Sequence, residues 1–216
     1  MSDRTAVIYR YDGSFDGFLN CIYEYYYSDI KVMPEKIESF ENEAYPYNFT
    51  HDYIDIETDN EKAKKVFKAI QNKISPEAAD TVYTAFLSDL INKEILLLKF
   101  IIKLFKNNKD ISANMADEAA APIIKAAQRV SRETHKLKGF IRFSESSEGF
   151  LFAVIEPSTD CLEFLGPHFS DRYKNECFAI IDKARKKALI YRPQNYIIKQ
   201  LDDITIPEKA ENDILY

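Results

Sequence analysis

Hydrophobic residues near the start of the chain follow first the period of a β-strand and then that of an α-helix. The run Thr5–Tyr9 is β-branched and aromatic and leads to an Asp-Gly pair at 12–13, which predicts a short strand and a turn. Ser14 then suits the N-cap of a helix over 14–28, because large apolar residues follow it at helical spacing. Alternation at Tyr53–Glu57 predicts another strand.

A long helical region follows these strands. The pattern predicts four helices, at roughly 60–73, 76–88, 89–107 and 116–137, divided by Ser75-Pro76 and by a polar loop near residue 107. A length of 216 residues allows one large domain or two small ones. We expect a single domain over 1–216, with a helical insert or subdomain at 59–115.

Strand patterns return after the helices. Gly139–Phe143 and Phe150–Glu156 flank a polar loop and predict a β-hairpin. Cys177–Asp182 and Lys187–Arg192 predict a second hairpin, and Pro167–Asn175 fits a short helix. The order of elements predicts an α+β fold, in which helices and a four-helix insert pack on a small mixed or antiparallel sheet.

Composition adds that the chain folds and stays in solution, since 46% of its residues are hydrophobic and 30% are charged. Its strongest apolar stretch, Ile95–Phe105, is interrupted by two lysines and is shorter than the roughly 20 residues that span a bilayer. No signal-peptide pattern follows Met1, and the three cysteines include no Cys-x-x-Cys pair. We therefore expect free thiols and a cytoplasmic location.

The net charge of −6 is not that of a general nucleic-acid binder, but the cations are clustered. Residues 119–144 hold six basic residues and one acid, and 183–199 hold six basic residues and no acid. On a helical projection of 116–137 the basic side chains lie opposite an apolar stripe. We predict nucleic-acid binding through Lys125, Arg129, Arg132, Lys136, Lys138 and Arg142, and through Arg172 beside the rings of the following segment. A solvated charged surface is the alternative.

Three residues are candidates for acid–base chemistry. His135 projects between the apolar and basic stripes, Glu156 ends a strand just before a proline, and His168 begins an aromatic segment that also holds Arg172. The sequence assigns none of them a catalytic role. His135 also fits a histidine bonded to backbone, and Glu156 also fits an ion pair with Arg132 or Arg142.

Signatures of common enzyme classes are absent from the sequence. It holds no P-loop, dinucleotide-binding, serine-hydrolase or zinc-protease motif. The three histidines also lack the close spacing of metal ligands, so neither a metal nor a cofactor is predicted. A carboxylate-based catalytic site assembled from distant segments remains an alternative.

Four blocks of sequence resemble one bacterial family. They are Tyr11–Leu19, Val130–Phe143, Ile155–Pro157 and Pro167–Arg172, and the resemblance covers about residues 6–192. The family is labelled "probable DNA metabolism protein". The resemblance implies DNA as a ligand, a radical S-adenosylmethionine protein as partner, and kinship to domains fused to uracil-DNA glycosylase-like domains. It carries Arg132, His135, Arg142, Glu156, His168 and Arg172 forward as candidate site residues.

The chain departs from that family in two places. Phe178 stands where a tryptophan is expected, and the chain stops at Tyr216 where members continue into a basic segment, which indicates a truncated chain or a shorter member. We expect a DNA metabolism or repair accessory protein that binds single-stranded or damaged DNA. The alternatives are an enzyme acting on a flipped base or nucleotide, with Asp12 as a further acid–base group, and an interaction scaffold for the radical protein.

Overall fold

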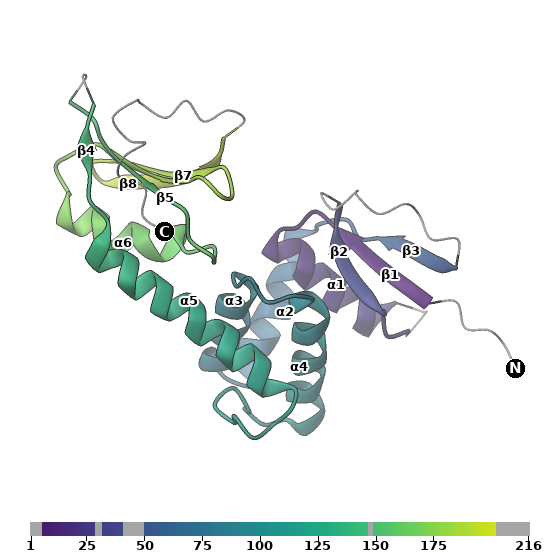
Figure 1. Cartoon of the computed structure of the whole chain (residues 1–216). Coiled ribbons are helices and arrows are strands. Elements are labelled where there is room, and N and C mark those ends of the chain that lie inside the picture. Colours follow the sequence, from purple (N-terminus) through teal and green to yellow (C-terminus); the bar gives the residue numbers. More distant parts are fainter. Residues whose placement is uncertain (1–5, 29–31, 41–49, 147–148, 202–216) are drawn as a thin grey trace, which may run out of the picture. The chain divides into compact units, whose positions relative to one another are not determined.

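A computed structural model describes residues 6–28, 32–40, 50–146 and 149–201 (Figure 1). The chain divides into two compact units: the first comprises residues 1–86 and 90–127, and the second comprises 87–89 and 128–216. The boundary falls inside one long helix. The single domain over 1–216 stays a prediction, and each unit is described separately below.

The first unit contains a three-stranded parallel sheet. Its central strand β1 (Ala6–Tyr11) lies between β2 (Lys36–Ser39) and β3 (His51–Asp55). Helix α1 (Phe15–Tyr27) follows β1 and packs on it, as a connection between parallel strands requires. The helix begins where it does because the Ser14 side chain accepts a hydrogen bond from the backbone of Gly17, at 2.9 Å.

Three more helices complete the first unit: α2 (Asn60–Lys73), α3 (Pro76–Phe86) and α4 (Lys93–Asn107). Asp59 caps α2 by accepting hydrogen bonds from two backbone amides of its first turn. Pro76 occupies the first position of α3, where its missing N–H costs nothing. These helices lie within the regions predicted from periodicity.

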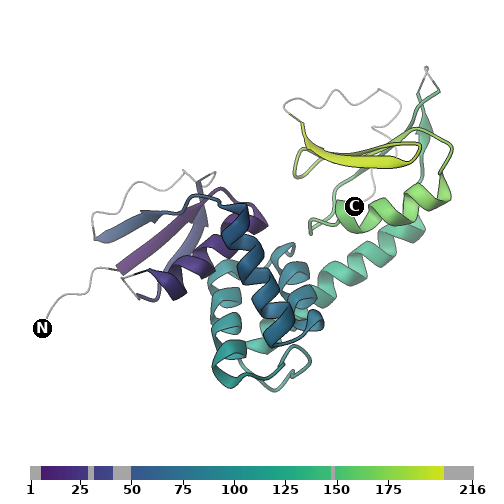
Figure 2. The same cartoon turned by 180° about the vertical axis from the view of Figure 1, so that it is seen from behind.

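The second unit is built on a five-stranded sheet and two helices. Helix α5 (Ala120–Phe140) contributes its residues from 128 onward to this unit. Helix α6 (Leu162–Arg172) covers one face of the sheet (Figures 1 and 2). The strands, in spatial order, are β4 (Ser144–Glu145), β5 (Leu151–Ile155), β6 (Phe178–Asp182), β7 (Lys187–Arg192) and β8 (Asn195–Gln200). Among these five described strands, only β5 and β6 pair in parallel, and α6 connects them.

The predicted α+β class is confirmed, with six helices and two sheets in the described part of the chain. The strand predicted at Gly139–Phe143 is wrong, because α5 continues to Phe140 and the amide of Ile141 still bonds to the carbonyl of Leu137. The short helix predicted from Pro167 begins earlier, at Leu162.

Two strands, β2 and β8, were not predicted. β2 has a single buried residue, Ile37, and most of β8 is exposed at the edge of its sheet, so neither shows an apolar alternation. No described helix is long and apolar enough to cross a membrane.

Candidate nucleic-acid interface

The second half of α5 has one buried face and one charged face. Val130, Thr134 and Leu137 are at most 8% exposed. The opposite face is exposed and carries Arg129, Arg132 and Lys136. The amphipathic pattern predicted from the sequence is therefore confirmed over this part of the helix.

A cavity of about 610 Å³ lies along that charged face, within the second unit. One wall is α5 and the other is the loop after β5, which contributes Pro157 and Ser158. Its α5 wall consists of Arg129, Arg132, Glu133, Lys136, Leu137 and Phe140. The ring of Phe140 is 62% exposed, so the groove offers an aromatic surface beside its cations.

The three cations of the groove are bound differently within the protein. Arg129 forms an ion pair with Asp89, with its Nη1 donating to the two carboxylate oxygens at 2.6 and 2.9 Å. Arg132 donates only to the neutral amide of Gln128, at 3.1 Å. Lys136 has no hydrogen bond or ion pair with any residue that the structure describes. Two positive charges are thus left without a counter-ion in the described structure.

Glu133 fixes the opposite wall of the groove. Its carboxylate accepts hydrogen bonds from the amides of Ser158 and Thr159, both at 2.8 Å, and from the Thr159 hydroxyl at 2.5 Å. Because a charged acceptor makes stronger hydrogen bonds than a neutral one, this contact ties the loop firmly to α5. Glu133 therefore holds the loop against α5, while its carboxylate still adds one negative charge to the lining of the groove.

A second set of contacts, made by Arg185, also holds this loop. The Arg185 guanidinium donates to the Pro157 carbonyl at 3.0 Å, to the Ser158 carbonyl, and to the Asp182 carboxylate at 3.0 Å. Asp182 ends β6 and is fully buried, so burial raises its pKa while the nearby guanidinium opposes that rise. The loop thus follows the carboxyl end of β5, beside its parallel neighbour, which is a common place for ligand sites.

The buried thiol next to this loop is unsuited to nucleophilic chemistry. Burial, with the nearby Glu133, Asp182 and Asp160 carboxylates, raises the pKa of Cys161 to about 12. The thiol is therefore protonated at neutral pH, whereas a nucleophilic cysteine needs the thiolate.

The other predicted nucleic-acid residues are not part of the cavity lining. Lys125 is exposed on the part of α5 that belongs to the first unit. Arg142 donates to the carbonyls of Gly139 and Ile141 at 3.0 and 3.1 Å, where a cation satisfies a helix end. Lys138 is half-buried, and Arg172 is exposed at the last turn of α6.

The predicted acid–base residues do not line this cavity either. His135 is exposed, Glu156 is half-buried, and neither Arg132 nor Arg142 pairs with that carboxylate. His168 is half-buried, and its Nε2 atom has no hydrogen-bond partner in the described structure. A catalytic role for any of the three stays a prediction.

Asp12, the further acid–base candidate, belongs to the first unit. Its carboxylate accepts hydrogen bonds from the Ser14 amide and hydroxyl, at 2.9 and 2.6 Å, and from the Thr58 hydroxyl at 2.8 Å. Burial raises its pKa, but these hydrogen bonds outweigh it and lower the pKa on balance. Asp12 therefore shapes the turn between β1 and α1.

Sequence reasoning missed the contribution of Phe140 to the groove. A signal for it exists, because residues 129, 132, 133, 136, 137 and 140 all follow the spacing of one helix face. Ending the helix at 137 assigned Phe140 to a strand.

Within the described residues no cluster of three or more His, Cys, Asp or Glu side chains is arranged to hold a metal.

The second unit is thus an α+β unit with a cationic groove between a helix and a loop. The chain belongs to the family described as a domain of unknown function, DUF4130, which matches residues 91–214. No curated protein matches the chain. Because this family has no assigned function, the likeness to DNA metabolism proteins stays an expectation.

One solved structure with a detectable likeness is a DHH-domain protein described as a member of a family of ribosomal proteins. It is 10% identical in sequence, and the match covers 88% of this chain and 74% of that one. The TM-score is 0.31, which is too low to indicate a shared fold.

Proposed function

We propose that the second unit binds single-stranded nucleic acid along the groove between α5 and the loop after β5. Arg132 and Lys136 would contact phosphates, and the Phe140 ring would stack on a base. The observation that carries this proposal is the presence of two cations that have no counter-ion among the described residues, beside a phenylalanine that is 62% exposed.

A single strand fits this chemistry better than a duplex. Proteins that hold single strands combine a positive groove for the backbone with aromatic rings for the bases, whose faces are stacked away inside a duplex. The whole chain carries a net charge of −6, so its overall charge does not attract a polyanion, and binding has to rest on a local cationic surface such as this groove. Such binding supports the role of an accessory factor, in which a radical S-adenosylmethionine partner would carry the chemistry.

The test is the salt dependence of oligonucleotide binding. Fluorescence anisotropy would compare labelled single-stranded and duplex DNA at about 50 and 200 mM salt. Replacing Arg132 and Lys136 with glutamine removes two phosphate contacts. For the single strand, the slope of log affinity against log salt concentration should therefore fall by about 1.4, and the loss of affinity between the two salt concentrations should become about sevenfold smaller. Phe140→Ala should weaken binding by about 1–3 kcal/mol at either salt, because stacking carries no charge.

Matched controls separate the groove from general charge. Lys183 and Lys199 are exposed in the other basic segment, so their double replacement by glutamine changes net charge equally and should leave the slope unchanged. Phe140→Tyr keeps the ring and should retain affinity. Equal losses in both double variants, or no binding by the wild type at the lower salt, would refute the proposal and favour an interaction scaffold.

A further inference from the structure

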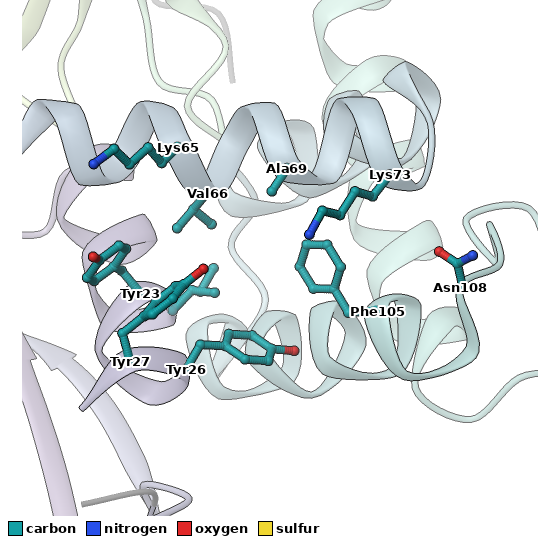
Figure 3. Close-up of a pocket in the computed structure, with 10 residues that line it drawn as sticks. Tyr23, Tyr26, Tyr27, Lys65, Val66, Ala69, Lys73, Phe105 and Asn108 are labelled. Atoms are coloured by element: carbon teal, nitrogen blue, oxygen red, sulfur yellow. The ribbon is translucent and has the colours of Figure 1, made fainter. Parts of the chain in front are cut away.

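A second cavity, of about 590 Å³, lies in the first unit and has no part in the groove described above. It opens between the last turns of α1, the middle and end of α2, and the end of α4 (Figure 3). Its volume falls within the range of roughly 300–1,000 Å³ that small-molecule sites occupy.

The wall formed by α1 consists of Ile22 and three tyrosine rings. Tyr23 and Tyr27 stack on each other, with centroids 4.5 Å apart and planes 26° apart. The Lys62 ammonium lies 5.3 Å from the centroid of the Tyr23 ring. Tyr27 lines the cavity and is 72% exposed. The stack therefore ends in a ring that a further planar group could cover.

The deeper part of this wall supplies a neutral hydroxyl. Tyr26 packs edge-on against the ring of Phe105, with centroids 5.8 Å apart. Burial raises the pKa of Tyr26 to about 12, so its hydroxyl is a hydrogen-bond donor at neutral pH. Val66 and Ala69 of α2 form an apolar floor opposite these rings (Figure 3).

Two lysines of α2, Lys65 and Lys73, stand at the two ends of that floor (Figure 3). Neither makes a hydrogen bond or an ion pair of 4 Å or less with a described residue. Eight residues of helix place their Cα atoms about 12 Å apart, so the two lysines border the cavity at separate places along α2. None of the described residues that line the cavity carries a carboxylate.

We propose that this cavity binds a nucleotide, with the base stacked on Tyr27 and the phosphate held by one of the two lysines. Rings for a planar group, a hydroxyl donor, cations outside any close ion pair and a lining without acids together match a planar aromatic anion. An uncharged aromatic would leave the lysines unused, and an inorganic anion would leave the rings unused. The site goes beyond the proposed groove and does not depend on it.

Calorimetric titration of the full chain tests this site, with adenosine 5′-monophosphate, adenosine and inorganic phosphate as probes. The monophosphate should bind at least tenfold more tightly than either fragment. Tyr27→Ala should weaken its binding about tenfold or more, since stacking on a ring is lost, whereas Tyr27→Phe should retain it. A Lys65→Gln/Lys73→Gln variant should bind the monophosphate no better than adenosine.

Two controls make the outcome specific. Lys68 is exposed on α2 outside the cavity, so Lys68→Gln should bind as the wild type does. The Arg132→Gln/Lys136→Gln variant of the other unit should also bind normally, which separates failure of this site from failure of the groove. The single variants Lys65→Gln and Lys73→Gln identify the source of the ligand. Binding of a free nucleotide should be weakened by only one of them, whereas binding of a short single-stranded oligonucleotide in this cavity should be weakened by both. No binding at millimolar nucleotide, or binding unchanged by the cavity variants, overturns the proposal.

Discussion

Glu133→Ala should destabilise the second unit by releasing the loop after β5. The carboxylate accepts hydrogen bonds from Ser158 and Thr159, and Thr159 is fully buried. The variant leaves two buried donors of Thr159, its amide and its hydroxyl, without their acceptor, and each such donor costs about 1–3 kcal/mol. Ser158 is exposed and can bond to water, so its amide adds little.

The sum of these two donors is about 2–6 kcal/mol, and entry of water from the adjoining cavity favours the lower half of that range. Urea unfolding followed by circular dichroism would measure the change. Amide hydrogen exchange at Thr159 would read the loop directly, which matters because two units need not unfold together. In a double-mutant cycle, Thr159→Val should couple to Glu133→Ala by about 1 kcal/mol. A destabilisation below about 0.5 kcal/mol, typical of a surface change, would refute this account of the loop.

Three further changes test other parts of the fold. Asp12→Ala removes the acceptor of Ser14 and should cost about 1–2 kcal/mol. Since the folded pKa of Asp12 is lowered, this difference in unfolding free energy should be full above the ordinary carboxyl pKa of about 4 and should vanish as the pH falls through the folded value. Gly166→Ala would place a Cβ 2.7 Å from the Tyr196 ring and should destabilise the protein by about 1–3 kcal/mol in thermal unfolding. A gain in stability would contradict this, because it would mean that the ring moves aside and the higher helix propensity of alanine prevails. Thr134→Val should be neutral or stabilising, because the buried Thr134 hydroxyl has no hydrogen-bond partner in the part of the chain that the structure describes, and a clear loss in urea midpoint would contradict that.

Sequence patterns located the elements whose signals are local. The expected Ser14 cap marks the observed start of α1, and the β7 strand was predicted with its observed bounds, Lys187–Arg192. β2 depends instead on parallel pairing with β1, across a connection that includes α1, and its own four residues show no pattern. Pairing between distant segments leaves little trace in a short edge strand.

The same distinction separates the parts of the groove. Its cations were predictable, because Arg132 and Lys136 share a helix face opposite buried residues. The bond from Thr159 to Glu133 joins residues 26 positions apart, and nothing in either segment marks the partner. Phe140 was missed because the predicted helix ended at residue 137, three residues early. Gly139 lies within the last turn of the observed helix, and a Cβ there would meet no atom within 4 Å.

The most direct test of the groove is a residue-resolved titration of the isotope-labelled full chain with a short single-stranded oligonucleotide, followed by amide chemical shifts. Binding in the groove predicts that the largest shifts cluster at Arg132, Lys136, Phe140 and Ser158 and disappear in Arg132→Gln/Lys136→Gln. Shifts confined to other parts of the chain, or shifts at these amides that survive the double variant, would contradict the claim that this face binds nucleic acid.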